Sequence, residues 1–495
     1  MSSHRQIFKS SAIIGGASAI NIAIGIAKVK ILAVLLGPTG IGLMGLYTNI
    51  MNIVSTVAGC GLSNSGVRQI AATGGKADVL AGVRRALWLG SLVLGIAGMI
   101  GLWLLRGPVA IWIFDDSRYA HEVGWISLGV LFTLLAGSQT ALLQGLRRIR
   151  DLALVNIIGA LIAAIAGVLL VYWRGQSGVL WFVLVAPVVS VLVAGYYTAR
   201  LPKLNRRKMH WRSVGIHSKA MIKLGIPIML AGLLTLGTAL ATRSLVFREL
   251  GVDASGYFQA AWAISMTYIS FVLGAMGMDY YPRLTEIIED HGQACKLVSE
   301  QSEMALLLSG PVILTLITLA PWLIHLLYTE GFAPAAEVLR WQALGDILKV
   351  SSWPMGFVLL AKGRGGLFMI TEFIWGLSYI GPIVVDVGDW GLVITGIAFW
   401  FAYLIYFLVM AIITARLIGY RPGSRNTLLL VILMIVGGLI VFCSDHSEIE
   451  GLIVGLIAVL FFGFYSLFRL NKLLDLRAWL KKKLVNRLRD DGVAK

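Results

Sequence analysis

The sequence predicts an all-α polytopic membrane protein with about fourteen transmembrane helices. Three observations predict this fold class: 58% of the 495 residues are hydrophobic, only 14% are charged, and the mean hydropathy is +0.83. Soluble domains carry about 25% charged residues, so a globule of this composition would not stay in solution. The three cysteines lie far apart and show no metal-ligand spacing, which excludes a disulfide scaffold.

Apolar runs of about 20 residues, the length that crosses a bilayer, follow one another along the chain. The first six lie near residues 10–36, 40–66, 86–105, 123–145, 152–173 and 178–199. Six more lie near 220–248, 254–281, 304–327, 337–361, 366–387 and 391–415, and the last two near 427–444 and 451–469. The 56 glycines fit this reading, because membrane helices tolerate glycine better than soluble helices do.

The basic residues orient these spans. With a cytoplasmic N-terminus, 33 of the 42 Lys and Arg residues fall in cytoplasmic segments, four in external segments and five inside spans. Cytoplasmic loops of membrane proteins carry such an excess, and an odd number of spans would break the alternation. Both termini are therefore predicted to be cytoplasmic. The net charge of +17 is mostly a consequence of topology, and no nucleic-acid partner is expected.

Two segments 214 residues apart resemble each other. Gly37 and Gly42 follow the first span as Gly251 and Gly256 follow the seventh, so the chain holds two sets of six spans. Six is an even number, which predicts lobes related by a pseudo-twofold axis along the membrane normal around a central cavity. The predicted parts are a first lobe (1–200), a basic cytoplasmic linker (201–219), a second lobe (220–418), and two C-terminal helices with a basic cytoplasmic tail (419–495).

Several short motifs resemble the MOP flippase superfamily. They are Leu35-Leu36-Gly37-Pro38 followed by Gly40 and Gly42, the stretch from Gly59 to Arg68, Leu142-Leu143-Gln144-Gly145, and Leu224-Gly225-Ile226-Pro227. Within the superfamily the chain is most similar to Wzx-type polysaccharide translocases, or O-antigen flippases, over roughly residues 10–418. MurJ-type lipid II flippases are the related alternative, because they have fourteen helices where Wzx proteins usually have twelve.

The resemblance implies a flippase that works by alternating access. Its substrate would be an undecaprenyl-pyrophosphate-linked oligosaccharide, an O-antigen or exopolysaccharide repeat unit. The protein would move this substrate from the cytoplasmic to the periplasmic leaflet of a bacterial inner membrane. Membrane lipid, a polysaccharide polymerase and a chain-length regulator are the further partners implied. No cofactor, metal or catalytic residue is expected, since the seven histidines are scattered and no pair has zinc spacing.

Five basic residues lie inside spans, where each would cost roughly 2.5–3.5 kcal/mol facing lipid at a helix centre. They are therefore expected to face water, a partner or a ligand such as a diphosphate. Lys28 and Lys30 point about 200° apart around one helix, and the small polar face on the side of Lys28 favours it as the cavity cation. Arg243 lies at a matching depth in the seventh span. Snorkelling to the interface is the alternative for all three residues.

Polar and aromatic side chains share single faces of other spans and would suit a sugar, although membrane helices also carry them for packing. The predicted substrate-binding residues are Lys28, Lys30, Asn52, Arg68, Arg243, Trp262, Lys349, Trp353 and Trp375. Asp346 and Glu372 are candidates for ion coupling, because a carboxylate away from water is easily protonated. Asp346 and Lys349 can instead simply neutralise each other one turn apart. The membrane potential acting on the anionic head group is the alternative driving force.

Two other functions compete with a flippase. A cation-coupled multidrug exporter of the same superfamily would usually keep acidic residues inside its first lobe, yet the first six spans contain no Asp or Glu. A membrane glycosyltransferase or ligase acting on the same lipid carrier would need room for an active site. The predicted external loops, none longer than about 18 residues, leave little room for one.

Overall fold

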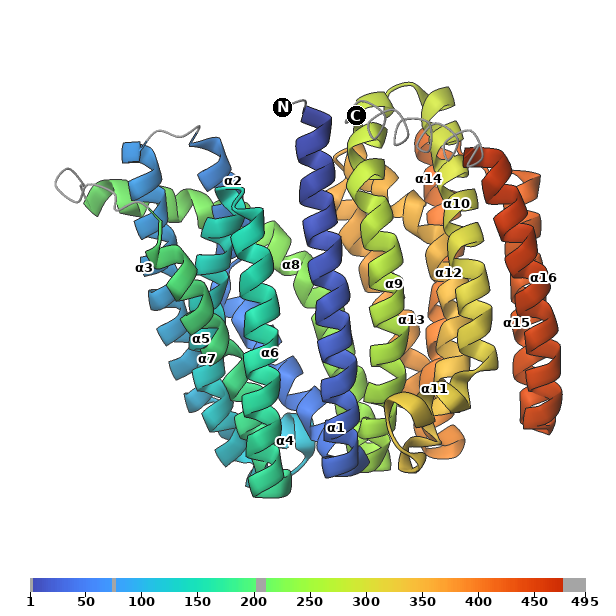
Figure 1. Ribbon diagram of the computed structural model, residues 1–495, viewed down its shortest axis with the longest axis horizontal. Coiled ribbons are helices and arrows are strands. Elements are labelled where there is room, and N and C mark those ends of the chain that lie inside the picture. Colours follow the sequence, from blue (N-terminus) through green and yellow to red (C-terminus); the bar gives the residue numbers. More distant parts are fainter. Residues whose placement is uncertain (1–2, 74–76, 202–210, 475–495) are drawn as a thin grey trace, which may run out of the picture. The chain divides into compact units, whose positions relative to one another are not determined.

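The computed structural model describes residues 3–73, 77–201 and 211–474, and these residues form helices and short turns with no β-strand (Figure 1). By length and composition, nine helical runs among them can cross a membrane, or ten if one bent pair counts as a span. Three of these runs have 44, 51 and 54 residues, and one crossing needs only about 20. The predicted all-α membrane architecture is confirmed, while the count of fourteen stays a prediction.

The chain forms two compact units. The first contains Met1–Ala260 and His325–Ala333, and the second contains Ala261–Ile324 and Pro334–Lys495. These boundaries are not those of the predicted lobes, 1–200 and 220–418, which remain a prediction. Much of the predicted linker and of the basic tail falls on residues 202–210 and 475–495, which lie outside the described residues.

The first unit is built from the helices that precede Ala260. They are α1 (Ser3–Gly59), α2 (Leu62–Ala72), α3 (Ala77–Leu104), α4 (Arg106–Phe114), α5 (Ala120–Gly145), α6 (Ile149–Arg174), α7 (Gly178–Ala199), α8 (Trp211–Leu250) and the first turns of α9 (Val252–Ile287). Leu62 and Ile70 of α2 pack with Leu87 of α3 and Leu143 of α5 in its buried core.

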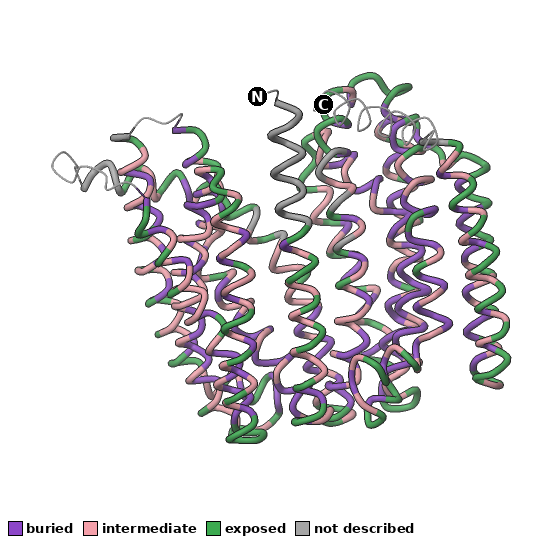
Figure 2. Tube along the Cα trace, viewed as in Figure 1, coloured by how far each residue is buried: buried purple, intermediate pink, exposed green. Residues whose placement is uncertain are grey.

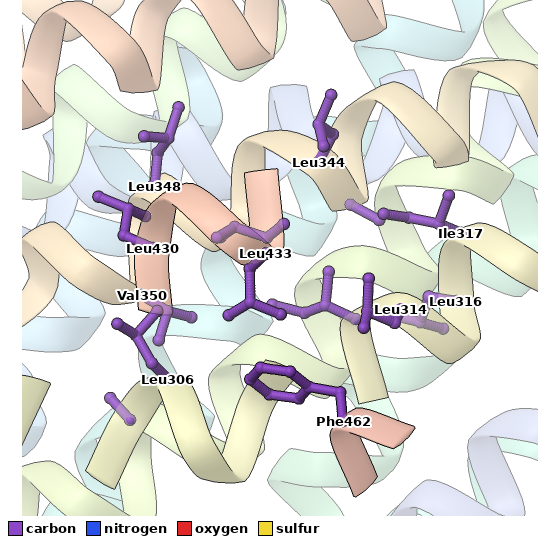
Figure 3. Packing of buried hydrophobic residues seen from close by; sticks show 14 of the residues in the cluster. Leu306, Leu314, Leu316, Ile317, Leu344, Leu348, Val350, Leu430, Leu433 and Phe462 are labelled. Atoms are coloured by element: carbon purple, nitrogen blue, oxygen red, sulfur yellow. The ribbon is translucent and has the colours of Figure 1, made fainter. Parts of the chain in front are cut away.

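The second unit holds the rest of α9 and the later helices. These are α10 (His291–Thr318), most of α11 (Ala320–Leu327), α12 (Ala335–Ala361), α13 (Gly365–Trp390), α14 (Ile394–Ile418), α15 (Ser424–His446) and α16 (Glu448–Leu474). Figure 3 shows its core, where Leu314, Leu344, Leu433 and Phe462 of four helices converge. In the most apolar stretch of α12, 78% of the residues are buried, against 22% in that of α16 (Figure 2). Polar groups on α12 can therefore lie away from lipid.

Two predicted spans are interrupted in the structure. The span near 40–66 is broken between Gly59, where α1 ends, and Leu62, where α2 begins. The span near 304–327 is broken at Leu319, because Pro321 in the next turn lacks the N–H that a continuous helix would need there. Neither break changes the apolar pattern, which is why hydropathy alone predicted continuous helices.

The two turns matched in the sequence also match in conformation. α1 departs from helical geometry at Gly37, which has a φ of 63°, and Gly251 between α8 and α9 has a φ of 88°. Glycine adopts positive φ without the steric cost that a side chain brings. Thr39 donates a hydrogen bond to Asp253, its own counterpart 214 residues later. The two turns therefore lie against each other within the first unit.

The glycines after these turns make reciprocal contacts. A Cβ added to Gly42 would lie 2.6 Å from the carbonyl oxygen of Val252 and 2.8 Å from the nitrogen of Gly256. A Cβ on Gly256 would in turn collide with the carbonyl oxygen of Pro38, the counterpart of Val252. Paired contacts of this kind are what a twofold axis produces. These two segments thus have a local pseudo-twofold relation.

Candidate functional site

A cavity of about 250 Å³ lies in the second unit among α12, α13 and α14. Four predicted site residues line it: Lys349 and Trp353 of α12, and Glu372 and Trp375 of α13. Their pairwise spacing on each helix made them candidates, and the structure brings the two pairs together around one space. The cavity therefore combines a cation, a carboxylate and aromatic rings.

Lys349 presents its ammonium to this cavity from among aromatic rings. The Nζ atom lies 5.4 Å from the ring centroid of Tyr403 and 5.7 Å from that of Phe399. It is also 4.0 Å from Asp346 Oδ1 and 3.3 Å from the sulfur of Met266. Aromatic faces attract a cation. These contacts hold the ammonium at the wall of the cavity.

Asp346 is fully buried behind Lys349 and is not part of the cavity lining. Its Oδ2 accepts a hydrogen bond from the Ser265 hydroxyl at 2.6 Å, which joins α9 to α12. Its Oδ1 accepts no hydrogen bond from any described residue and has Lys349 as its nearest charge. The geometry fits the alternative in which Asp346 and Lys349 neutralise each other, with the carboxylate orienting the ammonium.

Glu372 lies across the cavity on α13. Its Oε1 accepts a hydrogen bond from the hydroxyl of Tyr406 on α14 at 2.9 Å. Tyr403, one turn before Tyr406, also lines the cavity. Neither tyrosine was predicted from the sequence, yet their three-residue spacing in the span near 391–415 is the signal that could have found them.

Trp375 adds an unused hydrogen-bond donor. Its indole Nε1 is buried and makes no hydrogen bond within the described part of the chain. The Trp375 ring stacks on Tyr379 with centroids 5.5 Å apart, and Tyr379 stacks in turn on Trp262 of α9 at 6.3 Å. Trp262 does not line the cavity, so the structure places it behind the cavity wall as a support.

Arg243, the predicted cation of the seventh span, lies in the first unit. It is buried on α8, and its Nε donates a hydrogen bond to the side-chain oxygen of Gln259 at 2.9 Å. The guanidinium also lies 5.9 Å from the ring centroid of Phe258. Gln259 is the counterpart of Gly45 in the repeat, and a Cβ on Gly45 would meet its amide at 2.6 Å. Arg243 is therefore held at the junction of the two repeated segments.

The two lysines of the first span have different surroundings. Lys30 donates hydrogen bonds to the carbonyl oxygens of His325, at 2.8 Å, and of Tyr328. These carbonyls lie at the end of α11, where a cation interacts favourably with the helix dipole. Lys28 is half-buried, with its Nζ 5.6 Å from the ring centroid of Phe182 on α7. Lys30 is thus engaged within the protein, which leaves Lys28 as the better ligand candidate.

A second cavity, of about 330 Å³, lies in the first unit beside the break between α1 and α2. Ser55, Thr56, Ser63 and Asn64 line it, and none of the predicted site residues does. Asn52 lies one turn earlier, and its carbonyl oxygen accepts a hydrogen bond from Thr56 at 2.8 Å. Arg68 is exposed on α2. Asn52 and Arg68 are among the lining residues of neither cavity.

Known proteins resemble this chain in sequence and in fold. Residues 31–337 match the family described as "Polysaccharide biosynthesis protein". The lipid III flippase of Escherichia coli (strain K12) is 23% identical over 372 residues, which cover 74% of this chain and 88% of that protein. The lipid III flippase of Shigella flexneri matches equally well.

Two solved structures show the same fold. The inward closed conformation of the lipid II flippase MurJ has a TM-score of 0.69 at 13% identity and covers 94% of this chain and 100% of its own. An inward-facing multidrug resistance MATE family transporter of the MOP superfamily has a TM-score of 0.66 at 16% identity and covers 83% and 98%. Both comparisons concern transporters rather than enzymes.

Proposed function

The chain belongs to the polysaccharide biosynthesis protein family, and we propose that within it the protein is a flippase for a lipid-linked glycan. It is a multi-pass membrane protein with the fold of the MOP superfamily, as its sequence motifs predicted. Its relatives are flippases and transporters, and a glycosyltransferase or ligase is accordingly not proposed.

The cavity around Lys349 is the observation that carries this proposal. A glycan on a phosphate-linked lipid needs a cation for the phosphate and flat apolar surfaces with hydrogen-bonding edges for the sugar rings. Lys349 supplies the cation, Trp353 and Tyr403 supply ring faces, and the unused Nε1 of Trp375 supplies a donor. Because α12 is largely buried in protein, this polar site is shielded from lipid.

The substrate, the direction of transport, the membrane and the partners are proposed from the family resemblance. The substrate would be an undecaprenyl-pyrophosphate-linked O-antigen or exopolysaccharide repeat unit, moved from the cytoplasmic to the periplasmic leaflet by alternating access. The N- and C-termini would be cytoplasmic in a bacterial inner membrane. A polysaccharide polymerase and a chain-length regulator would be the protein partners. Lys28 and Arg243 are proposed as further phosphate ligands, with Asn52 and Arg68 as polar contacts along the route.

The test is flipping of a fluorescent polyprenyl-pyrophosphate-linked oligosaccharide in proteoliposomes. Lys349→Gln should slow flipping roughly ten- to a hundredfold, because a hydrogen bond to a charged group contributes about 1.5–3 kcal/mol. Lys296→Gln is the matched control, since that lysine is exposed on α10 with 78% of its side chain accessible. Equal flipping rates for the wild type and Lys349→Gln would contradict the assigned site.

A multidrug exporter is the second candidate, and one observation favours it. Glu372 and the surrounding rings could bind an organic cation, the usual partner of an acidic aromatic pocket. Overexpression in a drug-sensitive strain separates the two functions. A flippase should leave drug tolerance unchanged, whereas resistance that disappears in Glu372→Gln would support export instead.

A further inference from the structure

The break between α1 and α2 exposes the start of a helix inside the first unit. Cys60 and Gly61, between the two helices, have φ angles of 47° and 65°. A side chain at position 61 would collide with the backbone of Gly225, so the close approach of α8 requires a glycine there. Gly61 gives α2 no side-chain cap, and the earliest helical bond runs from the Ser65 nitrogen to the Gly61 carbonyl at 3.1 Å. The preceding N–H groups have no acceptor within the helix.

Residues of this first turn of α2 line the 330 Å³ cavity, and one buried serine of α1 lines it as well. Ser55 lines this cavity, is only 6% exposed, and its Oγ makes no hydrogen bond with any described residue. The neighbouring Thr56 behaves differently, because its hydroxyl donates to the carbonyl oxygen of Asn52. A buried hydroxyl without a partner is destabilising by about 1–3 kcal/mol. A bound acceptor at this position would remove that penalty.

The hydrogen-bond donors around the cavity indicate which kind of ligand it would bind. Ser55, Ser63 and the Asn64 amide join the N–H groups of the first turn of α2, and none of the lining residues is charged. A helix N-terminus carries roughly half a positive charge, which favours an anion over a cation or a neutral group. The remaining wall, Leu134 and Met229, is apolar and would exclude a large hydrated ion. The site fits a single anionic oxygen group.

We propose that the α1–α2 break binds a phosphate or carboxylate group through the first N–H groups of α2 and the hydroxyl of Ser55. Two sources could present this chemistry, the head group of a polyprenyl phosphate lipid or a free anion from solution. The proposal rests on the proposed function only for assigning the group to the transported lipid. Binding can be measured without transport, so its failure would leave the flippase proposal intact.

Cys60 provides a reporter inside the break. The chain has three cysteines, and the full-length variant Cys295→Ser/Cys443→Ser keeps only the partly exposed Cys60. In nanodiscs, the rate of its alkylation by N-ethylmaleimide should fall several-fold with inorganic phosphate or with polyprenyl phosphate in the bilayer. Protection by both probes, or by polyprenyl phosphate alone, supports the site and identifies the source. Equal protection by sodium chloride at matched ionic strength, or by neutral polyprenol, would overturn it.

Two substitutions distinguish anion binding at the break from non-specific shielding of Cys60. Ser55→Ala removes one donor and should raise the half-protecting concentration about five- to tenfold. Asn64→Asp places a carboxylate on the first turn of α2 and should abolish protection by competing for the same N–H groups. Ser91→Ala is the control, because Ser91 is also buried with an unpartnered Oγ but does not line the cavity. If both variants are protected like the control, the proposal is wrong.

Discussion

Arg340 illustrates how a single charge is accommodated inside a membrane helix. The side chain is 4% exposed on α12, and two of its nitrogens bond the two carboxylate oxygens of Glu448 at 2.5 and 3.1 Å. Its Nε also approaches the carbonyl oxygen of Ile317 at 3.4 Å. Bidentate geometry makes such a pair both strong and specific. Glu448 lies in the first turn of α16, so this pair joins α16 to α12 within the second unit.

Glu448→Gln should therefore destabilise the protein. The substitution leaves a buried guanidinium without its counter-charge, which costs about 3–5 kcal/mol when both partners are buried. Because Glu448 is 54% exposed, we expect a smaller loss of about 1–3 kcal/mol. Thermal unfolding in detergent should show a lower Tm, with Glu450→Gln in the same turn as the control. Adding Arg340→Met should restore part of the loss, and an unchanged Tm in Glu448→Gln would contradict the role of the pair.

Trp375→Phe should lower flipping without lowering stability. Replacing the indole removes a buried donor that has no partner in the ligand-free protein, so the Tm should stay equal or rise. Flipping should fall about five- to tenfold if that donor bonds the substrate. Trp400→Phe is matched, since Trp400 Nε1 is also buried and unpartnered but does not line the cavity. Loss of flipping in both variants would indicate a packing effect.

Turns and breaks between helices differ in how well the sequence predicts them. The turns at Gly37 and Gly251 could be matched because a positive φ leaves a glycine in the sequence at both positions. The break at Cys60 also carries a glycine of positive φ, Gly61, but the apolar pattern runs on across it, so hydropathy alone predicted one continuous helix. Residues on one helix face, such as Lys349 and Trp353, could likewise be grouped by spacing alone. Which other faces they would meet depends on packing between distant segments.

The paired turns give a test of movement between the predicted lobes. Thr39 and Asp253 are in hydrogen-bond contact, so a disulfide between Thr39→Cys and Asp253→Cys would tie the two repeated segments together. If alternating access separates these segments, oxidation should stop flipping and reduction should restore it. Each single cysteine variant is the control. Full flipping by a quantitatively cross-linked protein would show that the segments stay together throughout the cycle.

Each cation inside the predicted spans contacts groups from another helix. Of the five basic residues inside spans, Arg340 and Lys30 bond carbonyl or carboxylate oxygens and Arg243 bonds an amide, while Lys28 lies over the Phe182 ring and Lys349 lines a cavity. The sequence could separate these five residues from the basic residues of the loops and tails, because a charge inside a membrane is costly wherever it lies. The sequence could not tell which of these cations are paired within the protein and which are available to bind substrate, since the partners come from other helices.

We expect the membrane potential to drive transport. A diphosphate head group is anionic, and an inside-negative potential favours its outward movement by about 2.3 kcal/mol per charge per 100 mV. We therefore expect an imposed potassium diffusion potential of about −100 mV, without a pH gradient, to shift the labelled lipid toward the outer leaflet about fiftyfold per charge moved. Asp346 and Glu372, which accept hydrogen bonds from Ser265 and Tyr406, are the carboxylates that could carry a proton instead. A response to a pH gradient alone that disappears in Glu372→Gln would instead assign the coupling to a carboxylate.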